Sequence, residues 1–218
     1  MTDKIKAFIL DLDGVITDTA EFHFKAWKKM ADEEGIPFER KDNEKLRGVS
    51  RRKSMELILD GREMEEEKIQ KLMDRKNRYY NDFLDNLSHD DLLPGAQELM
   101  DEIIRRGYKM AVASSSRNAK TVIKNLGIMD IFDTISDGHS VENSKPAPDL
   151  FLHTAEKLAL DPERCVVIED AESGVEGALA ADMIAVGVGP GERVGKAHYR
   201  YDKVEDIDLD EIIEGEEE

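Results

Sequence analysis

The sequence has little cysteine, no excess of positive charge and no long apolar run. The single cysteine, Cys165, allows no internal disulfide, so we expect a reducing compartment and a cytoplasmic protein. No apolar run approaches the ~18 residues of a membrane span, so we expect no membrane partner. The formal net charge of -18 disfavours nucleic acid and anionic surfaces as partners. An anionic substrate therefore needs a local pocket of cations.

Four short apolar runs, rich in Ala, Val and Ile, are typical of parallel strands that are buried on both faces. They cover residues 5–10, 109–113, 165–168 and 183–188. Helical patterns lie between them, at residues 96–104, 119–126, 150–158 and 174–181. Alternation of strand and helix is typical of right-handed βαβ units. The sequence therefore predicts an α/β fold with a doubly wound, Rossmann-like parallel sheet.

Residues 18–91 differ from the rest of the chain because they contain no convincing buried strand. Helical spacing covers about 19–34, 51–60 and 65–87. This pattern predicts an all-helical cap domain, inserted after the first strand and lying over the carboxyl edge of the sheet. We therefore expect a cap domain of residues 18–91 and a core domain of residues 1–17 and 92–218.

Two aspartates, Asp11 and Asp13, directly follow the first apolar run and lead into Gly14. Two like charges this close raise each other's pKa unless a cation lies between them. The arrangement indicates a divalent metal site and a carboxylate that can accept a phosphoryl group. The alternative is an ordinary acidic turn after a strand.

Polar residues also follow the other predicted strands, at the edge where open α/β sheets bind ligands. They are Ser114, Ser116, Arg117 and Asn118 after the second strand, Lys145 after a third strand region, and Glu169 and Asp170 after the next. Taken singly, each group has a plain alternative. Ser116 or Asn118 can cap the following helix, Lys145 can be a solvated lysine before Pro146, and the carboxylates can be an acidic helix start.

Together and in this order, Asp11 and Asp13, Ser114, Lys145, and Glu169 and Asp170 resemble the haloacid dehalogenase-like superfamily of phosphotransferases. The resemblance covers nearly the whole chain. Within that superfamily, three further segments are similar to the β-phosphoglucomutase family: Asp11 to His23 followed by Ala26-Trp27, Gly48-Val49-Ser50-Arg51 with Ser54, and Ser144 to Asp149. Arg75-Lys76-Asn77 is similar as well. Arginine stands at Arg47 and Arg117, where that family usually has lysine.

The resemblance implies roles for the residues at the strand ends. Asp11 attacks phosphorus, and Asp13 serves as general acid and base. Ser114 and Lys145 bind phosphoryl oxygens. The implied cofactor is Mg²⁺, with ligands from the side chains of Asp11, Glu169 and Asp170 and from the backbone carbonyl of Asp13.

The resemblance also implies that the cap binds a phosphorylated hexose and keeps water out. Arg51 then binds the distal phosphate, and His23 and Lys76 couple cap closure to Asp13 and substrate. The other implied substrate-binding residues are Trp27, Arg47, Gly48, Val49, Ser50, Ser54, Ser116, Arg117 and Asn118. Without the resemblance to this family, the sequence pattern predicts a solvated histidine at His23 and a core residue at Trp27.

The implied activity is that of an isomerase converting β-D-glucose 1-phosphate to glucose 6-phosphate through β-glucose 1,6-bisphosphate. The alternative is a magnesium-dependent sugar-phosphate phosphatase with the same core and cap. A third possibility is a regulator that binds metal or phosphate without catalysis, which the complete set of motifs disfavours. We expect a monomer, as is usual in this family.

Overall fold

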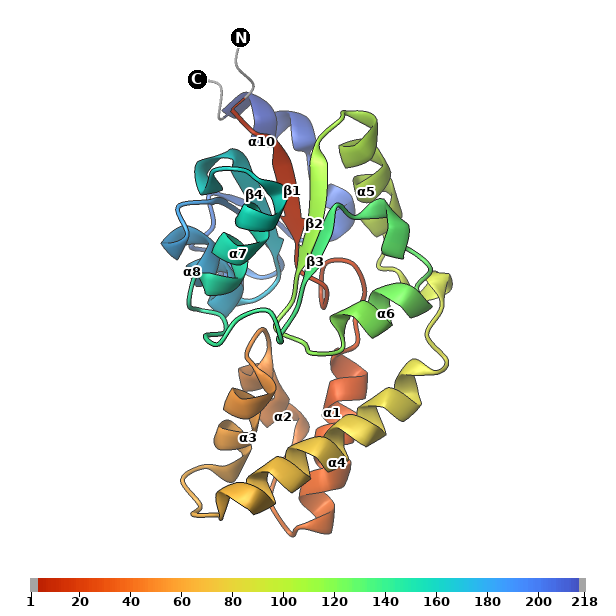
Figure 1. Cartoon of the computed structure of the whole chain (residues 1–218), viewed down its shortest axis with the longest axis vertical. Coiled ribbons are helices and arrows are strands. Elements are labelled where there is room, and N and C mark those ends of the chain that lie inside the picture. Colours follow the sequence, from red (N-terminus) through yellow and green to blue (C-terminus); the bar gives the residue numbers. More distant parts are fainter. Residues whose placement is uncertain (1–3, 216–218) are drawn as a thin grey trace.

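The computed structural model describes residues 4–215 and contains one sheet of six parallel strands with helices on both faces (Figure 1). The strands are β1 (Ala7–Leu10), β2 (Lys109–Ala113), β3 (Thr134–Ser136), β4 (Cys165–Glu169), β5 (Ile184–Val188) and β6 (Tyr199–Tyr201). Their order is β3-β2-β1-β4-β5-β6, and each neighbouring pair is parallel. The predicted α/β fold with a doubly wound sheet is confirmed.

The sheet is buried on both faces because successive strand residues face different helical layers. In β1, Phe8 and Leu10 face one layer, whereas Ala7 and Ile9 face the other, and all four are buried. The first layer consists of α5 (Ala96–Arg105), α6 (Ala119–Asn125) and α10 (Leu209–Gly215). The second consists of α7 (Asp149–Leu158), α8 (Glu172–Ala180) and α9 (Gly191–Val194). This double burial explains the continuous apolar runs in the sequence.

Residues 18–91, which lie between β1 and α5, form a separate group of helices, called here the helical insert. It contains α1 (Ala20–Glu33), α2 (Arg40–Asn43), α3 (Arg51–Leu59) and α4 (Glu66–Leu84). No strand occurs within residues 20–91, all of which are described. The insert has its own core, in which Trp27, Met30 and Met55 are buried. Figure 1 shows the insert beyond the carboxyl end of β1, at the opposite end of the molecule from α10.

The two ends of the insert lie side by side where they join the sheet domain. Thr17 forms an antiparallel bridge with Leu92, and its hydroxyl donates a hydrogen bond to the Asp91 carbonyl (2.7 Å). The Leu93 amide donates to the Ile16 carbonyl (2.9 Å). The insert is thus connected to the sheet domain through two adjacent segments of chain.

Several short elements were not predicted in detail. No bounds are predicted for β3, and β6 is not predicted at all. Both are edge strands of three residues that are mostly half-buried or exposed, so their apolar signal is weak. Short 3₁₀ helices also occur at Glu44–Leu46, His89–Asp91, Met129–Ile131, Pro162–Arg164 and Val204–Asp206. Within residues 4–215, no helix combines the length and the apolar character that crossing a membrane requires.

Candidate active site

The strand register brings the carboxyl ends of β1, β2 and β4 together. Leu10 pairs with Val112 of β2 and with Ile168 of β4. Asp11 follows Leu10, and its backbone amide donates a hydrogen bond to the Ile168 carbonyl (2.9 Å). The winding of the sheet reverses between β1 and β4, which is where open α/β sheets form their ligand crevice.

A fully buried lysine, Lys145, joins these three strand ends. Its ammonium donates hydrogen bonds to Asp11 Oδ1 (2.7 Å) and to the Ala113 carbonyl (2.8 Å), and it forms an ion pair with Glu169. The side chain of Lys145 is 0% exposed. An ammonium has three donors, and these three partners engage all of them. Asp11 is therefore held in one orientation by a cation that water does not reach.

Three buried carboxylates lie close enough to share a metal ion. Asp11, Glu169 and Asp170 each offer an oxygen, and these oxygens all lie within 4.8 Å of one another. An all-oxygen set of this kind suits a hard divalent cation. Gly14, with φ +90°, approaches so closely that a Cβ there would collide with the Asp170 carboxyl group. The glycine after the two aspartates is thus required by the packing of the third carboxylate.

The pKa values in this cluster reflect burial first and charge second. Burial lowers the pKa of Lys145, but the Asp11 and Glu169 carboxylates outweigh that effect and raise it above the usual value. Burial, reinforced by Asp11, raises the pKa of Asp170 to about 7. Burial and Asp11 also raise the pKa of Glu169, against the opposing charge of Lys145. Burial and the charge of Asp11 therefore disfavour the ionised forms of Glu169 and Asp170.

Asp13 is held apart from this cluster by the residue that precedes α1. Its Oδ1 accepts hydrogen bonds from the Thr19 amide (3.1 Å) and the Thr19 hydroxyl (2.5 Å). The Tyr80 hydroxyl of α4 lies 2.8 Å from Thr19 Oγ1, and since the Thr19 proton points to Asp13, Tyr80 is the donor. Burial raises the pKa of Asp13 to about 6. The hydrogen bonds found among the described residues all use Oδ1, which leaves Oδ2 for another partner.

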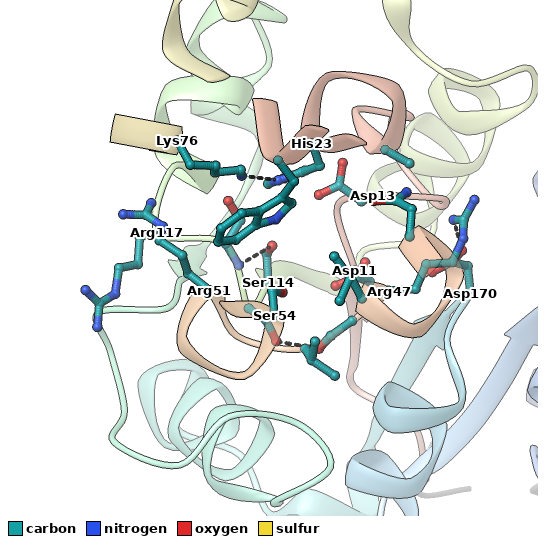
Figure 2. A pocket seen from close by; sticks show the side chains of 18 residues that line it. Asp11, Asp13, His23, Arg47, Arg51, Ser54, Lys76, Ser114, Arg117 and Asp170 are labelled. Carbon is teal, nitrogen blue, oxygen red and sulfur yellow. Dashed lines mark hydrogen bonds and ion pairs between the residues drawn. The ribbon is translucent and has the colours of Figure 1, made fainter. Parts of the chain in front are cut away.

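The insert contributes a buried ammonium group surrounded by rings. Lys76 Nζ lies 2.7 Å from His23 Nδ1, 4.9 Å from the centre of the Trp27 ring and 4.7 Å from that of Tyr80. Figure 2 shows His23 and Lys76 pointing toward each other. Burial and the nearby Arg51 lower the pKa of Lys76 well below its usual value. Burial and Lys76 likewise lower the pKa of His23. An anion bound beside Lys76 and Arg51 would therefore favour their charged forms.

A second contact zone joins the insert to the loop after β2. Arg51 Nη2 donates to Asn77 Oδ1 (2.7 Å), and Asn118 Nδ2 donates to the same oxygen (2.8 Å). The loop itself is ordered by its hydroxyls, because Ser114 Oγ accepts from the Ser116 amide (3.1 Å) and Ser116 Oγ from the Asn118 amide (3.2 Å). Arg51 and the loop thus face each other across the site.

Asp170 is also approached by two arginines, one from each part of the molecule. Arg47 Nη1, from the insert, lies 2.9 Å from Asp170 Oδ2, and Arg193 Nη2, from α9, lies 3.7 Å from the same oxygen. Glu44 of the insert contacts both, at 3.2 Å from Arg47 Nε and 4.0 Å from Arg193 Nη1. Figure 2 shows Arg47 beside Asp170.

Most of the residues proposed from the sequence line a single cavity between the sheet edge and the insert (Figure 2). These are Asp11, Asp13, His23, Trp27, Arg47, Gly48, Val49, Arg51, Ser54, Lys76, Ser114, Ser116, Arg117 and Asp170. Four others do not line it. Lys145 and Glu169 lie buried behind Asp11, the Ser50 hydroxyl caps α3 by accepting from the Lys53 amide (3.2 Å), and Asn118 contacts Asn77.

The family model of haloacid dehalogenase-like hydrolases matches residues 5–182. The chain belongs to the haloacid dehalogenase-like hydrolase family. This confirms the superfamily resemblance that the four motifs indicated.

Within this family, the chain is similar to two β-phosphoglucomutases and to one phosphatase. β-Phosphoglucomutase of Bacillus subtilis is 44% identical over 214 residues, which cover 96% of this chain and 95% of that protein. A crystal structure of β-phosphoglucomutase from Clostridium difficile matches with a TM-score of 0.93 at 39% identity, covering 96% of each chain. A phosphorylated carbohydrates phosphatase of Thermotoga maritima is 30% identical over 82% of each chain. The predicted similarity to the β-phosphoglucomutase family is confirmed.

Sequence reasoning missed several residues that line this site or contact its carboxylates. Thr19 and Tyr80 orient Asp13, Ser115 lines the cavity, and Arg193 contacts Asp170. Tyr80 lies on the apolar side of α4, so its hydroxyl carries no signal in the hydrophobic pattern. Thr19 precedes α1, where its residue type suits a helix cap and hides the contact with Asp13.

Gly174→Ala tests whether Glu169 must occupy its place beside Lys145. A Cβ at Gly174 would collide with the Glu169 carboxyl group, so that group must move and weaken its ion pair. We expect a loss of about 3 kcal/mol in the free energy of unfolding, the scale of a broken buried pair. Gly191→Ala is the control, because no atom lies within 4 Å of its added Cβ. Urea unfolding of both variants measures the difference, and equal stabilities would show that Glu169 is free to move.

Proposed function

We propose that this chain is an isomerase that interconverts β-D-glucose 1-phosphate and glucose 6-phosphate through an aspartyl-phosphate enzyme and β-glucose 1,6-bisphosphate. The observation that carries the proposal is a cavity with a cation buried behind one end and two cations lining the other. Lys145 lies behind Asp11 at one end, and Arg51 and Lys76 come from the insert at the other. Binding of a sugar with two phosphates requires cations at both ends of the cavity. Hydrolysis of a single phosphate ester requires only the cation at the end next to Asp11. The 44% identity to the Bacillus mutase supports the same reading.

Mg²⁺ suits the carboxylate cluster because the cluster is buried, consists of oxygen ligands and has raised pKa values at Glu169 and Asp170. The side chains of Asp11, Asp170 and Glu169 and the backbone carbonyl of Asp13 would hold the ion. When bound, Mg²⁺ neutralises charge between the Asp11 carboxylate and an incoming phosphoryl group.

In the proposed transfer, an Asp11 oxygen forms a bond to phosphorus while the bond from phosphorus to the sugar oxygen breaks. Lys145 holds Oδ1 of Asp11, so the other oxygen is free to attack. Asp13 gives a proton to the departing sugar oxygen, and in the second half it removes a proton from the attacking hydroxyl. Thr19 holds Oδ1 of Asp13, which leaves Oδ2 for this exchange.

Ser114 and Lys145 are the proposed partners of the phosphoryl oxygens. The Ser114 hydroxyl lines the cavity at the end of β2. The three donors of Lys145 are already engaged, so a direct bond to phosphate requires one of those hydrogen bonds to be given up. Otherwise Lys145 contributes its charge and the orientation of Asp11.

We infer that the helical insert, residues 18–91, is a cap that closes over the bound sugar. Its cavity-lining residues Arg47, Gly48, Val49, Arg51 and Ser54 face the strand ends. Closure keeps water from the phosphoenzyme while the sugar turns round. The remaining proposed substrate contacts are His23, Trp27, Ser50, Lys76, Ser116, Arg117 and Asn118. We further propose a cytoplasmic monomer.

A magnesium-dependent sugar-phosphate phosphatase is the second candidate, favoured by the 30% identity to the Thermotoga phosphatase. It would use the same Asp11, Asp13, Lys145 and Asp170. It differs only in letting water reach the aspartyl phosphate.

The two candidates differ in the product they form. With Mg²⁺ and a trace of β-glucose 1,6-bisphosphate, we expect β-glucose 1-phosphate to become glucose 6-phosphate with little free phosphate. The reason is that the insert supplies cations with no required role in attack at phosphorus. A coupled dehydrogenase assay for glucose 6-phosphate and a colorimetric phosphate assay on one sample measure both. Stoichiometric phosphate release without glucose 6-phosphate would refute the mutase and leave the phosphatase.

Arg51→Ala separates binding of the second phosphate from attack at the first. Arg51 lies in the insert, so its loss should lower kcat/KM for the mutase reaction by about 10- to 100-fold, the effect of one charged hydrogen bond. Hydrolysis of acetyl phosphate, which has one phosphate, should change little. The neighbouring Arg52→Ala is the control because Arg52 pairs with Glu56 and Glu66 on the surface. Equal losses on both substrates in Arg51→Ala would contradict the assignment.

A further inference from the structure

A serine of the core forms a hydrogen bond with the loop of the insert that precedes α3. The Ser115 hydroxyl donates a hydrogen bond to the Gly48 carbonyl (2.9 Å). Among the described residues, it is the one side-chain hydrogen bond to the backbone of residues 47–49. Ser115 directly follows Ser114 at the end of β2, and Gly48 lies between Arg47 and Arg51. The bond therefore joins the reacting end of the site to the part of the insert that closes it.

The packing around Gly48 shows that this contact is close. Gly48 has φ +68°, and a Cβ there would lie 2.5 Å from Ser173 Oγ and 2.9 Å from the Ala171 Cβ. The loop thus rests directly on the segment of the core that leads into α8. The Ser173 hydroxyl is buried but has no hydrogen-bond partner among the described residues. Ser173 packs against the loop without a hydrogen bond, whereas Ser115 forms a hydrogen bond with it.

The contact lies where it can oppose movement of the insert away from the core. The insert is attached covalently at Thr17 and Leu92, whereas Gly48 lies on the cavity side of the insert. Arg47 also joins this loop to the core, but its partner Asp170 is a proposed metal ligand. The contact between Ser115 and Gly48 involves no charged group and no proposed metal ligand, so it acts in every state in which the loop rests on the core.

From these contacts we propose that Ser115 is a positioning residue whose hydroxyl latches the insert over the cavity and so limits the loss of the phosphoenzyme to water. The inference rests on the proposed function. A neutral hydrogen bond of this kind shifts a two-state equilibrium by about 2- to 10-fold. Since water reaches Asp11 when the insert is open, loss of the latch increases hydrolysis by the same factor. Transfer within the closed state is unchanged.

Ser115→Ala removes the donor and keeps the backbone. In the mutase assay with Mg²⁺ and β-glucose 1,6-bisphosphate, we expect the ratio of free phosphate to glucose 6-phosphate to rise about 2- to 10-fold. Hydrolysis of acetyl phosphate should not fall. Ser173→Ala is the matched control, because it removes a hydroxyl that touches the same loop without a hydrogen bond. It should keep the ratio of the unaltered protein.

A second measurement detects opening of the insert without depending on catalysis. Trp27 is the sole tryptophan of the chain, is buried, and lines the cavity. Acrylamide quenching of its fluorescence should therefore increase in Ser115→Ala and not in Ser173→Ala. If the unaltered protein proves to be a phosphatase, this quenching still tests the latch. Unchanged quenching in Ser115→Ala, or a loss of acetyl phosphate hydrolysis parallel to the mutase reaction, overturns the proposal. An equal response of Ser173→Ala also overturns it.

Discussion

The geometry of this site depends on one buried ammonium group and its three acceptors. An unpaired charge in a protein interior costs several kcal/mol, so Lys145 is stable only while Asp11, Ala113 and Glu169 surround it. Those acceptors belong to the ends of β1, β2 and β4. The requirement to satisfy the lysine therefore fixes the relative positions of three strand ends, and with them the orientation of the carboxylate that we propose as the nucleophile. A rigid fold supplies this precision without help from the substrate.

The distribution of charge within the molecule is as informative as its total. A net charge of -18 repels phosphorylated sugars at a distance, yet the cavity collects Arg47, Arg51, Lys76 and Arg117. Close charges act more strongly than distant ones, which solvent screens. Burial first, and neighbouring cations second, lower the pKa values of Lys76 and Arg51, so holding these charges in the cavity costs free energy. Such a cost is expected where a ligand with more than one phosphate compensates for it.

The sequence predicted the sheet core and the residues at the strand ends, because apolar runs buried on both faces and polar residues after them leave a clear pattern. It predicted the insert as helical because apolar residues there recur at helical spacing and form no buried strand pattern. Contacts between distant segments left no such pattern. The Tyr80 hydroxyl sits on an apolar helix face, and Ser115 looks like a second copy of its neighbour Ser114. Arg193 of α9 contacts Asp170, which follows β4, and no local spacing in the sequence encodes that contact.

The central claim is that Asp11, held by Lys145, accepts the phosphoryl group. Its most direct test is to incubate the protein with Mg²⁺ and acetyl phosphate, quench rapidly, reduce the acyl phosphate with borohydride and locate the modified residue by peptide mass spectrometry. The account predicts modification at Asp11 and none in an Asp11→Asn variant. Modification at Asp13 or Ser114, or undiminished turnover of the variant, would contradict it.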